Sequence, residues 1–569
     1  MNKRLILLTF CILSFLAADV FAQGTPSPGY SIAQTVTRFD YPGDIPDSSG
    51  VGGDDVLAGY DLDKDGKGEI ILITDNLAAS QEGPAIIVFE ATADNTYEAV
   101  WWFEVREHTN DNGSFPTLAV GDLDGDNQLE ILAGIPYGAR EIPNNPVRFY
   151  VFEVDTTVDN GLPQEPTATW TFEANPTDNT RPSAMDVYDV DGDGQQEVLM
   201  IFRAWNNGGN AFMIFSLVGD FFGGFTTFTK EFFDDTNLTE SDGNIYDVHV
   251  HDVNGDGTPE ISAVEWEADG IIAVFYQATG PDQYQMVHKA VSDFTFSAGA
   301  LGSFLPWDID GDGIEEFMMA GSDGQLYVVP VPNGDVKQIT ASSFNPINLY
   351  DNQIRGAAIG DFDDDGNVDY LIAGSYNKKI FRVEYKGSGS VTDANSYDFT
   401  TVYDDPNAGR YYYIAFPQDR KALRDGQTLV DMDGDNKREL VFTDQEDTAL
   451  GDNSIYVTIL ESDIAVKVEL PDLSTLPSGF ELHQNFPNPF NPETVIQYDI
   501  PRAGQVKITV HNLLGETIAT LVDEYKGLGT HRVTWNGKDF NGVNVPSGVY
   551  IYTIIAGDFK QSKQMTLLK

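Results

Sequence analysis

Seven copies of one acidic motif, Asp-x-Asp-x-Asp-Gly-x-x-Glu, contain the residues of this chain that are best suited to binding a metal ion. The copies begin at Asp61, Asp122, Asp189, Asp252, Asp308, Asp361 and Asp431. Carboxylates at positions one, three and five of such a loop can turn inward around a hard cation, which prefers about six to eight oxygen ligands. The motif therefore predicts a calcium-binding loop that is repeated along the chain.

The other positions of the motif fit the same geometry. Position six must turn sharply with a positive φ angle, and every copy has Gly or Asn there. Position seven is expected to offer only its backbone carbonyl, so its side chain is free to vary, and position nine returns a carboxylate. The predicted metal ligands are Asp61, Asp63, Asp65, Lys67, Glu69; Asp122, Asp124, Asp126, Gln128, Glu130; Asp189, Asp191, Asp193, Gln195, Glu197; Asp252, Asn254, Asp256, Thr258, Glu260; Asp308, Asp310, Asp312, Ile314, Glu316; Asp361, Asp363, Asp365, Asn367, Asp369; and Asp431, Asp433, Asp435, Lys437, Glu439.

Two other interpretations explain the loops less well. Asp-Gly and Asp-Asn dipeptides also mark ordinary turns between strands, but turns alone do not require the same residue types at every position of every copy. An EF-hand needs a bidentate Glu at position twelve, where the first copy has Leu72 and the fourth has Ala263. In the fourth copy Asn254 replaces an Asp, which removes a charge, so we expect that site to be the weakest.

A short apolar run typical of a strand follows each loop directly, at residues 70–73, 131–133, 198–202, 261–264, 317–320, 370–373 and 440–442. Successive loops begin 61, 67, 63, 56, 53 and 70 residues apart. This spacing accommodates four short strands with their turns, which is the size of a propeller blade.

The loops resemble FG-GAP/VCBS-type repeats, the calcium-loop blades of integrin α-chain propellers and of many secreted bacterial proteins. The resemblance extends over all the copies and implies up to seven bound calcium ions. Outer strands are expected at residues 97–105, 167–173, 225–233, 284–291, 335–341 and 398–403. Residues 32–39 are expected to complete the last blade beside 454–460, because closure removes exposed strand edges. We therefore predict an all-β chain with a seven-bladed β-propeller over residues 28–468.

Residues 1–22 have the features of a secretory signal peptide. Lys3 and Arg4 precede an apolar stretch at 5–18, and Val20-Phe21-Ala22 forms a cleavage site before Gln23. The only cysteine, Cys11, is removed with this segment, so we expect no disulfide in the mature chain. We also expect no transmembrane segment in the mature chain, because no later run is long and apolar enough.

The formal net charge of −56 is unevenly distributed. From residue 479 onward eight basic residues balance eight acidic ones, so the whole excess of negative charge lies in residues 1–478. Such an acidic surface disfavours nucleic acid or an anionic membrane as a partner. The charge is typical of a soluble extracellular protein.

A linker at residues 469–480 is expected to precede a second domain at 481–569. Its expected strands, at 494–498, 505–511, 517–522, 529–535, 548–556 and 559–568, predict a small immunoglobulin-like antiparallel β-sandwich. Four motifs stand out: Gln484-Asn-Phe-Pro-Asn-Pro-Phe-Asn-Pro492, Asn512-Leu-Leu-Gly515, Pro546-Ser-Gly-Val-Tyr550 and Lys563-Gln-Met-Thr-Leu-Leu-Lys569.

These motifs resemble the C-terminal sorting domain of type IX secretion cargo. The resemblance implies a Gram-negative bacterium, the type IX secretion machinery as a partner, and export through the periplasm. The protein would then be released or attached to the outer-membrane surface. A plain immunoglobulin-like accessory domain of the flagellar-hook-cap type is the alternative.

No catalytic set stands out in the sequence. HExxH and GxSxG motifs are absent, and the alternation around His249 and His251 favours ordinary strand residues. The most unusual surface candidate is a predicted insertion at residues 404–428, which contains Arg410-Tyr-Tyr-Tyr413, Arg420, Lys421 and Arg424. Aromatic side chains with basic neighbours suit sugar stacking or a protein contact, although a loop packing its tyrosines locally would also explain them.

Three functions are compatible with these patterns. We favour a non-enzymatic binding or adhesion module that presents loops to a glycan or a surface protein. The alternatives are a calcium-dependent polysaccharide-active enzyme of the lyase type, and a purely structural surface component. The fold cannot choose among them, because propellers support many functions.

Overall fold

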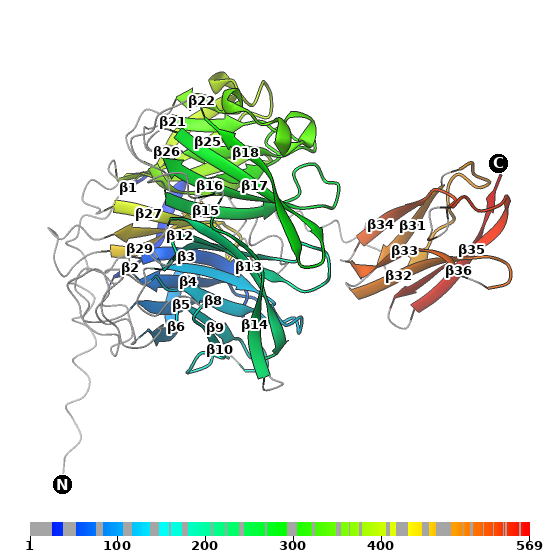
Figure 1. Cartoon of the computed structure of the whole chain (residues 1–569), viewed down its shortest axis with the longest axis horizontal. Helices are drawn as coiled ribbons and strands as arrows, with labels where there is room; N and C mark the ends of the chain where they lie inside the picture. The colour runs from blue at the N-terminus through cyan, green and yellow to red at the C-terminus, as the bar shows by residue number, and fades with distance from the viewer. Residues whose placement is uncertain are drawn as a thin grey trace, which may run out of the picture. The chain divides into compact units, whose positions relative to one another are not determined.

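The structure, a computed structural model of the whole chain, divides into two compact units, Met1–Val466 and Lys467–Lys569 (Figure 1). The described residues are 25–37, 53–74, 84–105, 116–136, 147–158, 161–172, 180–205, 209–221, 225–236, 238, 244–267, 270–292, 304–320, 325–348, 354–363, 365–374, 378–404, 410–416, 429, 431–445, 455–462, 480–492, 494–500, 504–515, 517–526, 529–538, 540, 543–556 and 559–568. The predicted signal peptide and nearly all of the predicted linker lie outside these residues.

The described part of unit 1 forms seven antiparallel sheets, which we call blades 1 to 7. Blades 1 to 3 are β3 (Gly53–Tyr60), β4 (Glu69–Thr74), β5 (Ala85–Ala93), β6 (Thr96–Glu104); β7 (Thr117–Gly121), β8 (Glu130–Gly134), β9 (Phe149–Glu153), β10 (Ala168–Trp170); and β11 (Arg181–Tyr188), β12 (Glu197–Ala204), β13 (Ala211–Asp220), β14 (Phe225–Asp234). Blades 4 and 5 are β15 (Asn244–His251), β16 (Glu260–Glu267), β17 (Gly270–Gly280), β18 (Gln283–Val291); and β19 (Leu305–Trp307), β20 (Glu316–Ala320), β21 (Gln325–Val329), β22 (Asn345–Asn348). Blades 6 and 7 are β23 (Ile354–Gly360), β24 (Asp369–Gly374), β25 (Lys379–Tyr385), β26 (Tyr397–Asp404) with β1 (Thr25–Pro26); and β27 (Arg410–Ala415), β28 (Glu439–Gln445), β29 (Ile455–Ser462) with β2 (Tyr30–Thr37).

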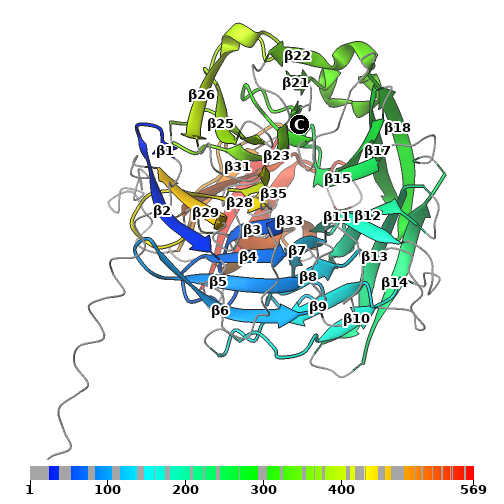
Figure 2. The ribbon, with the colours of Figure 1, turned by 90° about the vertical axis from the view of Figure 1, so that its left-hand side faces the viewer.

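The sheets lie one after another around a common centre, as repeated propeller blades do (Figure 2). The predicted all-β propeller fold is therefore confirmed. The predicted number of blades stays a prediction, with which the seven sheets of the described residues agree.

The core of unit 1 is divided among the spaces between neighbouring blades. Strands such as β4 and β8 are buried along their whole length, because a neighbouring blade covers each face. Seven apolar clusters result, each built from two adjacent blades. The cluster that contains Val36, Ile70, Leu72, Met432 and Val441 joins blade 7 to blade 1 and so closes the ring.

The closing blade combines the two ends of unit 1. Strand β2 pairs antiparallel with β29, with Tyr30 opposite Ser462, so the predicted pairing of these two segments is confirmed. Just before it, β1 pairs with β26 of blade 6, and the Ser27 N–H donates to the carbonyl of Val402. The N-terminal segment thus joins two neighbouring blades, which the sequence did not predict.

Five of the six predicted outer strands are present as β6, β10, β14, β18 and β26. The prediction for residues 335–341 is wrong, because this segment turns through the short 3-10 helices η3 (Pro332–Gly334), η4 (Val336–Gln338) and η5 (Ala341–Ser343). The Asp335 side chain accepts from the Lys337 N–H and caps η4, which ends the extended run. The outer strand of blade 5 is β22 instead. A further 3-10 helix, η6 (Ala394–Ser396), precedes β26.

The predicted insertion at 404–428 is only partly an insertion. Residues 410–415 form β27, the first strand of blade 7, with Arg410 opposite Gln445 in β28. An aromatic run of Tyr residues is typical of a strand, so β propensity explains this part. The side chains at 410–413, and all of Arg420, Lys421 and Arg424, lie outside what the structure describes.

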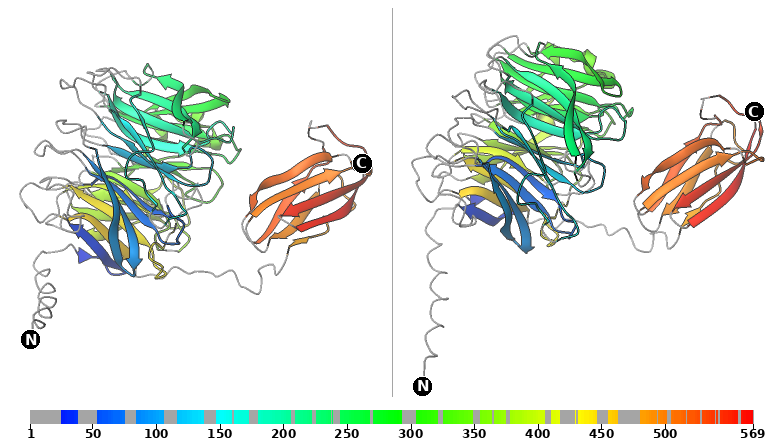
Figure 3. Two further views of the ribbon diagram at one scale, coloured as in Figure 1. Left: turned by 90° about the horizontal axis from the view of Figure 1, so that it is seen from below. Right: turned by 60° about the horizontal axis from the view of Figure 1, so that its bottom comes forward.

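Unit 2 consists of two antiparallel sheets. Its strands are β30 (Glu481–Leu482), β31 (Thr494–Ile500), β32 (Gly504–His511), β33 (Thr517–Lys526), β34 (Gly529–Trp535), β35 (Gly548–Ala556) and β36 (Phe559–Leu567). The orders are β30-β31-β34 and β33-β32-β35-β36, and the two layers are visible in Figure 3. One apolar cluster, which includes Tyr498, Trp535, Tyr552 and Met565, contains buried side chains from both sheets. All six strands expected from the sequence are present.

No helix among the described residues is long and apolar enough to cross a membrane.

Candidate metal centres

Each acidic loop connects the first and second strands of its blade. Loops 1 to 7 span residues 61–69, 122–130, 189–197, 252–260, 308–316, 361–369 and 431–439, and only residue 364 among them lies outside the described part. Strand direction alternates within a blade, and every blade repeats the same order of strands. All the loops therefore belong to the same end of the ring.

The backbone of the loops repeats with little variation. Position six has a positive φ in every loop, as predicted, from 66° at Asn127 to 95° at Gly194. Position four also has a positive φ wherever it is described, at Lys64, Gly125, Gly192, Gly255, Gly311 and Gly434. The sequence carried this second signal, because five of the seven copies have Gly at position four. Both positions need the left-handed conformation that Gly tolerates best.

Three hydrogen bonds recur in every loop and orient its carboxylates. The position-one carboxylate accepts from the N–H of position six at 2.7–3.3 Å. The position-five carboxylate accepts from the N–H of position seven at 2.7–2.9 Å. The position-nine carboxylate accepts from the N–H of position two at 2.6–3.2 Å. The backbone therefore orients these three side chains in every loop.

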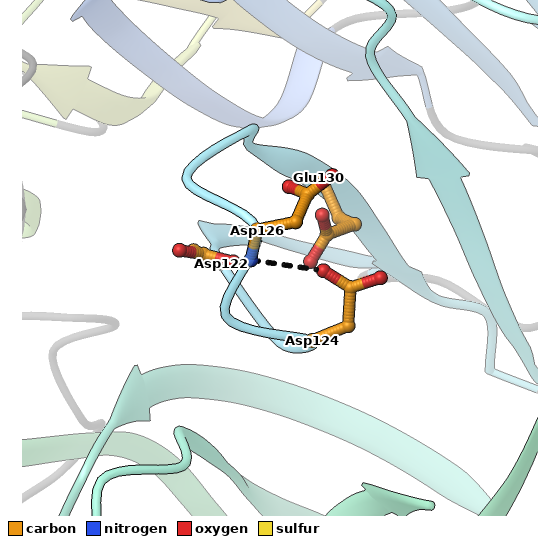
Figure 4. A group of neighbouring side chains, drawn as sticks. All are labelled: Asp122, Asp124, Asp126 and Glu130. Atoms are coloured by element: carbon orange, nitrogen blue, oxygen red, sulfur yellow. Dashed lines mark hydrogen bonds between the residues drawn. The ribbon is translucent and has the colours of Figure 1, made fainter. Parts of the chain in front are cut away.

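Carboxylate oxygens converge in these loops. In loop 2, oxygens of Asp122, Asp124, Asp126 and Glu130 lie within 4.8 Å of one another, and loops 3 and 7 bring together the equivalent four residues. Figure 4 shows the loop 2 group, in which the Asp126 N–H donates to Asp124 Oδ1 at 3.2 Å. In loop 1 the first three carboxylates converge in the same way. The four predicted carboxylates thus lie together in loops 2, 3 and 7, and three of the four do so in loop 1.

The position-nine carboxyl is buried in each loop, with 0–6% of its residue exposed. Burial raises the pKa of Glu69, Glu197 and Glu439 to about 9, that of Glu316 to about 8 and that of Glu260 to about 7. Burial also raises the pKa of Glu130 and of Asp369 well above the ordinary value. These carboxyls need either a proton or a nearby cation to be stable where they are.

The donor set fits a hard divalent cation. In Glu130 and Glu439 one oxygen accepts the position-two N–H, while Oε1 of each is buried and receives no hydrogen bond from the described residues. An oxygen that is buried and lacks a donor is suited to a metal ion. A calcium ion at such a site would supply positive charge that holds four side chains together, and the oxygen atoms of these residues would bind it.

The residue type at position seven varies, as expected, but in two loops its side chain forms ion pairs that the sequence did not predict. The Lys67 ammonium contacts Asp65 at 2.8 Å and Glu90 at 2.6 Å. Lys437 contacts Asp435 at 3.3 Å and also pairs with Glu461. Two loops therefore contain a basic side chain of their own beside the position-five carboxylate. The proposed carbonyl ligand at position seven stays a prediction.

Position three connects several loops to the next blade. Asp433 accepts from the Asn95 N–H at 2.6 Å, which joins loop 7 to the β5–β6 turn of blade 1. The Asp282 N–H donates to Asp191 at 2.6 Å in the same way. These contacts join residues far apart in sequence, so no local pattern could predict them.

The loops also contact one another around the ring. The Gly68 N–H of loop 1 donates to the Met432 carbonyl of loop 7 at 2.9 Å, and Glu315 and Val253 repeat this contact between loops 5 and 4. A Cβ atom at Gly68 would lie 2.8 Å from the Met432 side chain, so only glycine fits this approach. These neighbouring loops are therefore in direct backbone contact.

His249 and His251 are buried residues of β15, as predicted. His249 Nε2 lies 2.8 Å from Asp247 Oδ1, and His251 Nδ1 lies 3.8 Å from Glu315 Oε2. The His251 ring also packs edge-on against Phe317 at 4.9 Å. The His249 contact lies within blade 4, and the His251 contacts belong to the packing between blades 4 and 5.

The fold and the loops together define a β-propeller with a repeated acidic loop between the first and second strands of its blades. Residues 308–372, which include loops 5 and 6, match the family of FG-GAP-like repeats. No curated protein matches the chain in sequence.

Several solved structures are similar to this chain in fold. One is PorZ, described as an essential bacterial surface component of the type-IX secretion system of Porphyromonas gingivalis, with 11% identity and a TM-score of 0.38 over 88% of this chain. The chain spans 58% of the length of that protein. Another is the periplasmic gluconolactonase PpgL of Pseudomonas aeruginosa, with 11% identity and a TM-score of 0.37 over 62% of this chain and 98% of the other. At this identity and TM-score, the similarities carry no information about function.

Proposed function

We propose that this protein is an exported, calcium-stabilised β-propeller that acts as a non-enzymatic binding module at the bacterial surface or outside the cell. One observation carries the proposal: seven equivalent loops hold three carboxylates each by the same three hydrogen bonds, and one of the three, at position nine, is buried at the base of the loop. Such a buried carboxylate is costly to keep without a cation. Calcium is the cation that suits this all-oxygen set.

Calcium has a structural task in this proposal. Each ion neutralises acidic residues of its own loop, and the loops contact neighbouring blades, so binding strengthens the ring as a whole. Calcium sites of extracellular modules have dissociation constants of roughly 0.1 to 1 mM, which suits an exported protein. The stabilised end of the ring then offers a fixed surface to a glycan or a surface protein.

The proposal of export is based on the N-terminal segment and on unit 2. We propose that residues 1–22 direct the chain out of the cytoplasm and that unit 2 is recognised by the type IX secretion machinery. The motifs of residues 484–569 support this role, and unit 2 has a separate core that suits an independent domain. The host would then be a Gram-negative bacterium, and the protein would be released or attached to its outer surface.

Thermal unfolding tests the calcium role. The melting temperature of the purified protein is measured in calcium and in chelator, and calcium is expected to raise it strongly. Changing Asp126, Asp193 and Asp435 together to Asn keeps the turn hydrogen bond of each loop but removes three charges, so the gain from calcium should shrink. Thr258→Ala, at an exposed position-seven side chain, is the matched control and should keep the gain.

Two further measurements test binding and export. A glycan array read with and without calcium should show binding only with calcium, and an unchanged melting temperature in chelator would refute the calcium role.

Deleting residues 481–569 should leave the protein in the periplasm of a bacterium that has type IX secretion. Normal export of the truncated chain would refute the role of unit 2.

A further inference from the structure

Four blades place a second carboxylate directly across from the position-nine carboxylate of the loop. The third strand of each blade lies beside the second, and register decides which residue faces position nine. The facing pairs are Glu69 with Glu90, Glu130 with Glu153, Asp369 with Glu384, and Glu439 with Glu461. In blades 3 and 4 the facing residue is neutral, Ser216 or Gln277. Blade 3 also brings Glu231 close to Asp191, but Glu231 accepts a hydrogen bond from the Tyr284 hydroxyl at 2.9 Å.

In three of these four blades a basic side chain lies beside the acidic pair and bridges the loop and the third strand. Lys67 contacts Glu90 and Asp65 in blade 1, and Lys437 contacts Glu461 in blade 7. In blade 6, Arg382 pairs with Glu384, Asp363 and Asp369. The protein itself therefore provides a cation for the second carboxylate in each of these blades.

Blade 2 has the carboxylate but lacks such a cation among the described residues. Position seven is Gln128, whose Nε2 donates to Asp126 Oδ2 at 2.6 Å and whose Oε1 accepts from the Thr156 N–H at 3.0 Å. Val151 occupies the register position that Arg382 has in blade 6. Neither the loop nor the third strand therefore provides a positive charge here.

The two carboxyl groups of blade 2 are deeply buried. Glu153 is 4% exposed and Glu130 is not exposed at all. Both oxygens of Glu153, and Oε1 of Glu130, receive no hydrogen bond from any described donor. Burying two facing carboxylates without donors is unfavourable, and a divalent cation between them would remove the repulsion and supply both with a ligand.

We propose that Glu153 is a further carboxylate ligand for the cation at loop 2, shared with Glu130, and that loop 2 binds calcium more tightly than the other six loops. The inference rests on the proposed calcium function. It follows that loops 1, 6 and 7, each of which has a basic side chain from the loop or the third strand beside its carboxylates, have less need of calcium. Affinity for calcium increases with the number and charge of its ligands, which favours loop 2.

Glu153→Gln tests the inference, with Glu461→Gln as its matched control. Both residues are buried and face the position-nine carboxylate, but only Glu461 has a lysine partner. The full chain is loaded with calcium and passed through gel filtration in calcium-free buffer, and the calcium that remains bound is counted by elemental analysis. A calcium isotherm gives the affinity of the tightest site.

The wild type is expected to retain one ion, and Glu153→Gln should lose it, with the tightest affinity weakened by about tenfold or more. Glu461→Gln should retain the ion. In chelator, Glu153→Gln should raise the melting temperature because it removes a buried repulsion, whereas Glu461→Gln should lower it by leaving Lys437 without that partner.

An unchanged tightest affinity in Glu153→Gln, in a wild type that binds calcium, would overturn this inference alone and would indicate that the two carboxyls share a proton. A wild type that binds no calcium at all would overturn the proposed function and this inference together.

Discussion

The two units of this chain achieve stability in different ways. Unit 2 has a balanced charge and one apolar cluster to which both sheets contribute. Unit 1 carries nearly the whole charge excess and divides its core among seven clusters between blades. The ring of unit 1 must stabilise the crowded carboxylates of its loops as well as bury apolar side chains. The small sandwich of unit 2 depends mainly on the packing of its two sheets.

Removal of calcium should give the largest difference between the units. At free calcium about ten times the dissociation constant, each loop adds about 1.4 kcal/mol, so seven independent loops would add at most roughly 10 kcal/mol to unit 1. Calorimetry of the whole chain should show the unit 1 transition falling steeply in chelator while the unit 2 transition stays in place. Equal shifts of both transitions would break the comparison.

A change of pH should give the next largest difference in stability between the two units. The pKa of Glu69, Glu197 and Glu439 is raised by burial from 4.5 to about 9 in the folded, metal-free protein. The folded state then holds more protons than the unfolded one, so the free energy of unfolding of unit 1 in chelator should fall as pH rises from about 5 to 9.

The same pH series in saturating calcium is the control. Calcium binds the ionised carboxylates, so this loss of stability at high pH should disappear. Unit 2 should change little in either buffer, and chemical denaturation at each pH measures all of these effects. A unit 1 that becomes more stable toward pH 9 in chelator would contradict the prediction.

Trp535→Ala should have the opposite effect to calcium removal, because it should destabilise unit 2 and not unit 1. Trp535 is 2% exposed, packs against Phe490 and Tyr550 at 5.6 and 5.2 Å, and donates its indole N–H to the Lys538 carbonyl. Its removal should cost unit 2 about 3 to 5 kcal/mol and leave unit 1 and its response to calcium unchanged. Exposed Leu514→Ala in the same unit is the control and should have little effect.

The smallest expected effect concerns loop 4, where Asn254 stands in place of Asp. Asn254→Asp adds a charge to the ligand set and should strengthen calcium binding there. It also removes the Asn254 Nδ2 bond to the Gly334 carbonyl of blade 5, so in chelator it should cost unit 1 about 1 kcal/mol.

Thr258→Asp adds the same charge to an exposed side chain of the same loop, and it should not strengthen binding. Calcium titration with thermal unfolding measures both variants. Equal strengthening by both would show that total charge, and not the ligand position, determines affinity.

The loops illustrate how much the sequence can predict. The positive φ at Gly66 follows from position six of the motif, and the strands after each loop follow from their apolar runs, because these features are local. The contact between Asp433 and Asn95 depends on which blades become neighbours, so no local pattern contains it. The strand predicted at 335–341 is wrong for a local reason. The Asp335 side chain caps a 3-10 helix in a segment whose residue types suggested an extended strand.

The bridging lysines were missed for a related reason. Lys67 occupies a position whose side chain was expected to vary among the copies, and its partner Glu90 comes close only because β4 pairs with β5 so that Glu90 lies opposite Glu69. The same register identifies Glu153 as a carboxylate without a bridging base.

Ring closure has a consequence for the order of events in folding. Ser31 and Glu461, which contact each other across the closing pair of strands, are 430 residues apart in sequence. Closing so long a loop is entropically expensive, and contacts of this kind form late. Blade 7 therefore cannot be completed until nearly all of unit 1 has been synthesised, and until then β2 lacks its partner β29 and has an exposed edge. A chain that stops before residue 455 would retain an open ring, and such an edge is a site for aggregation.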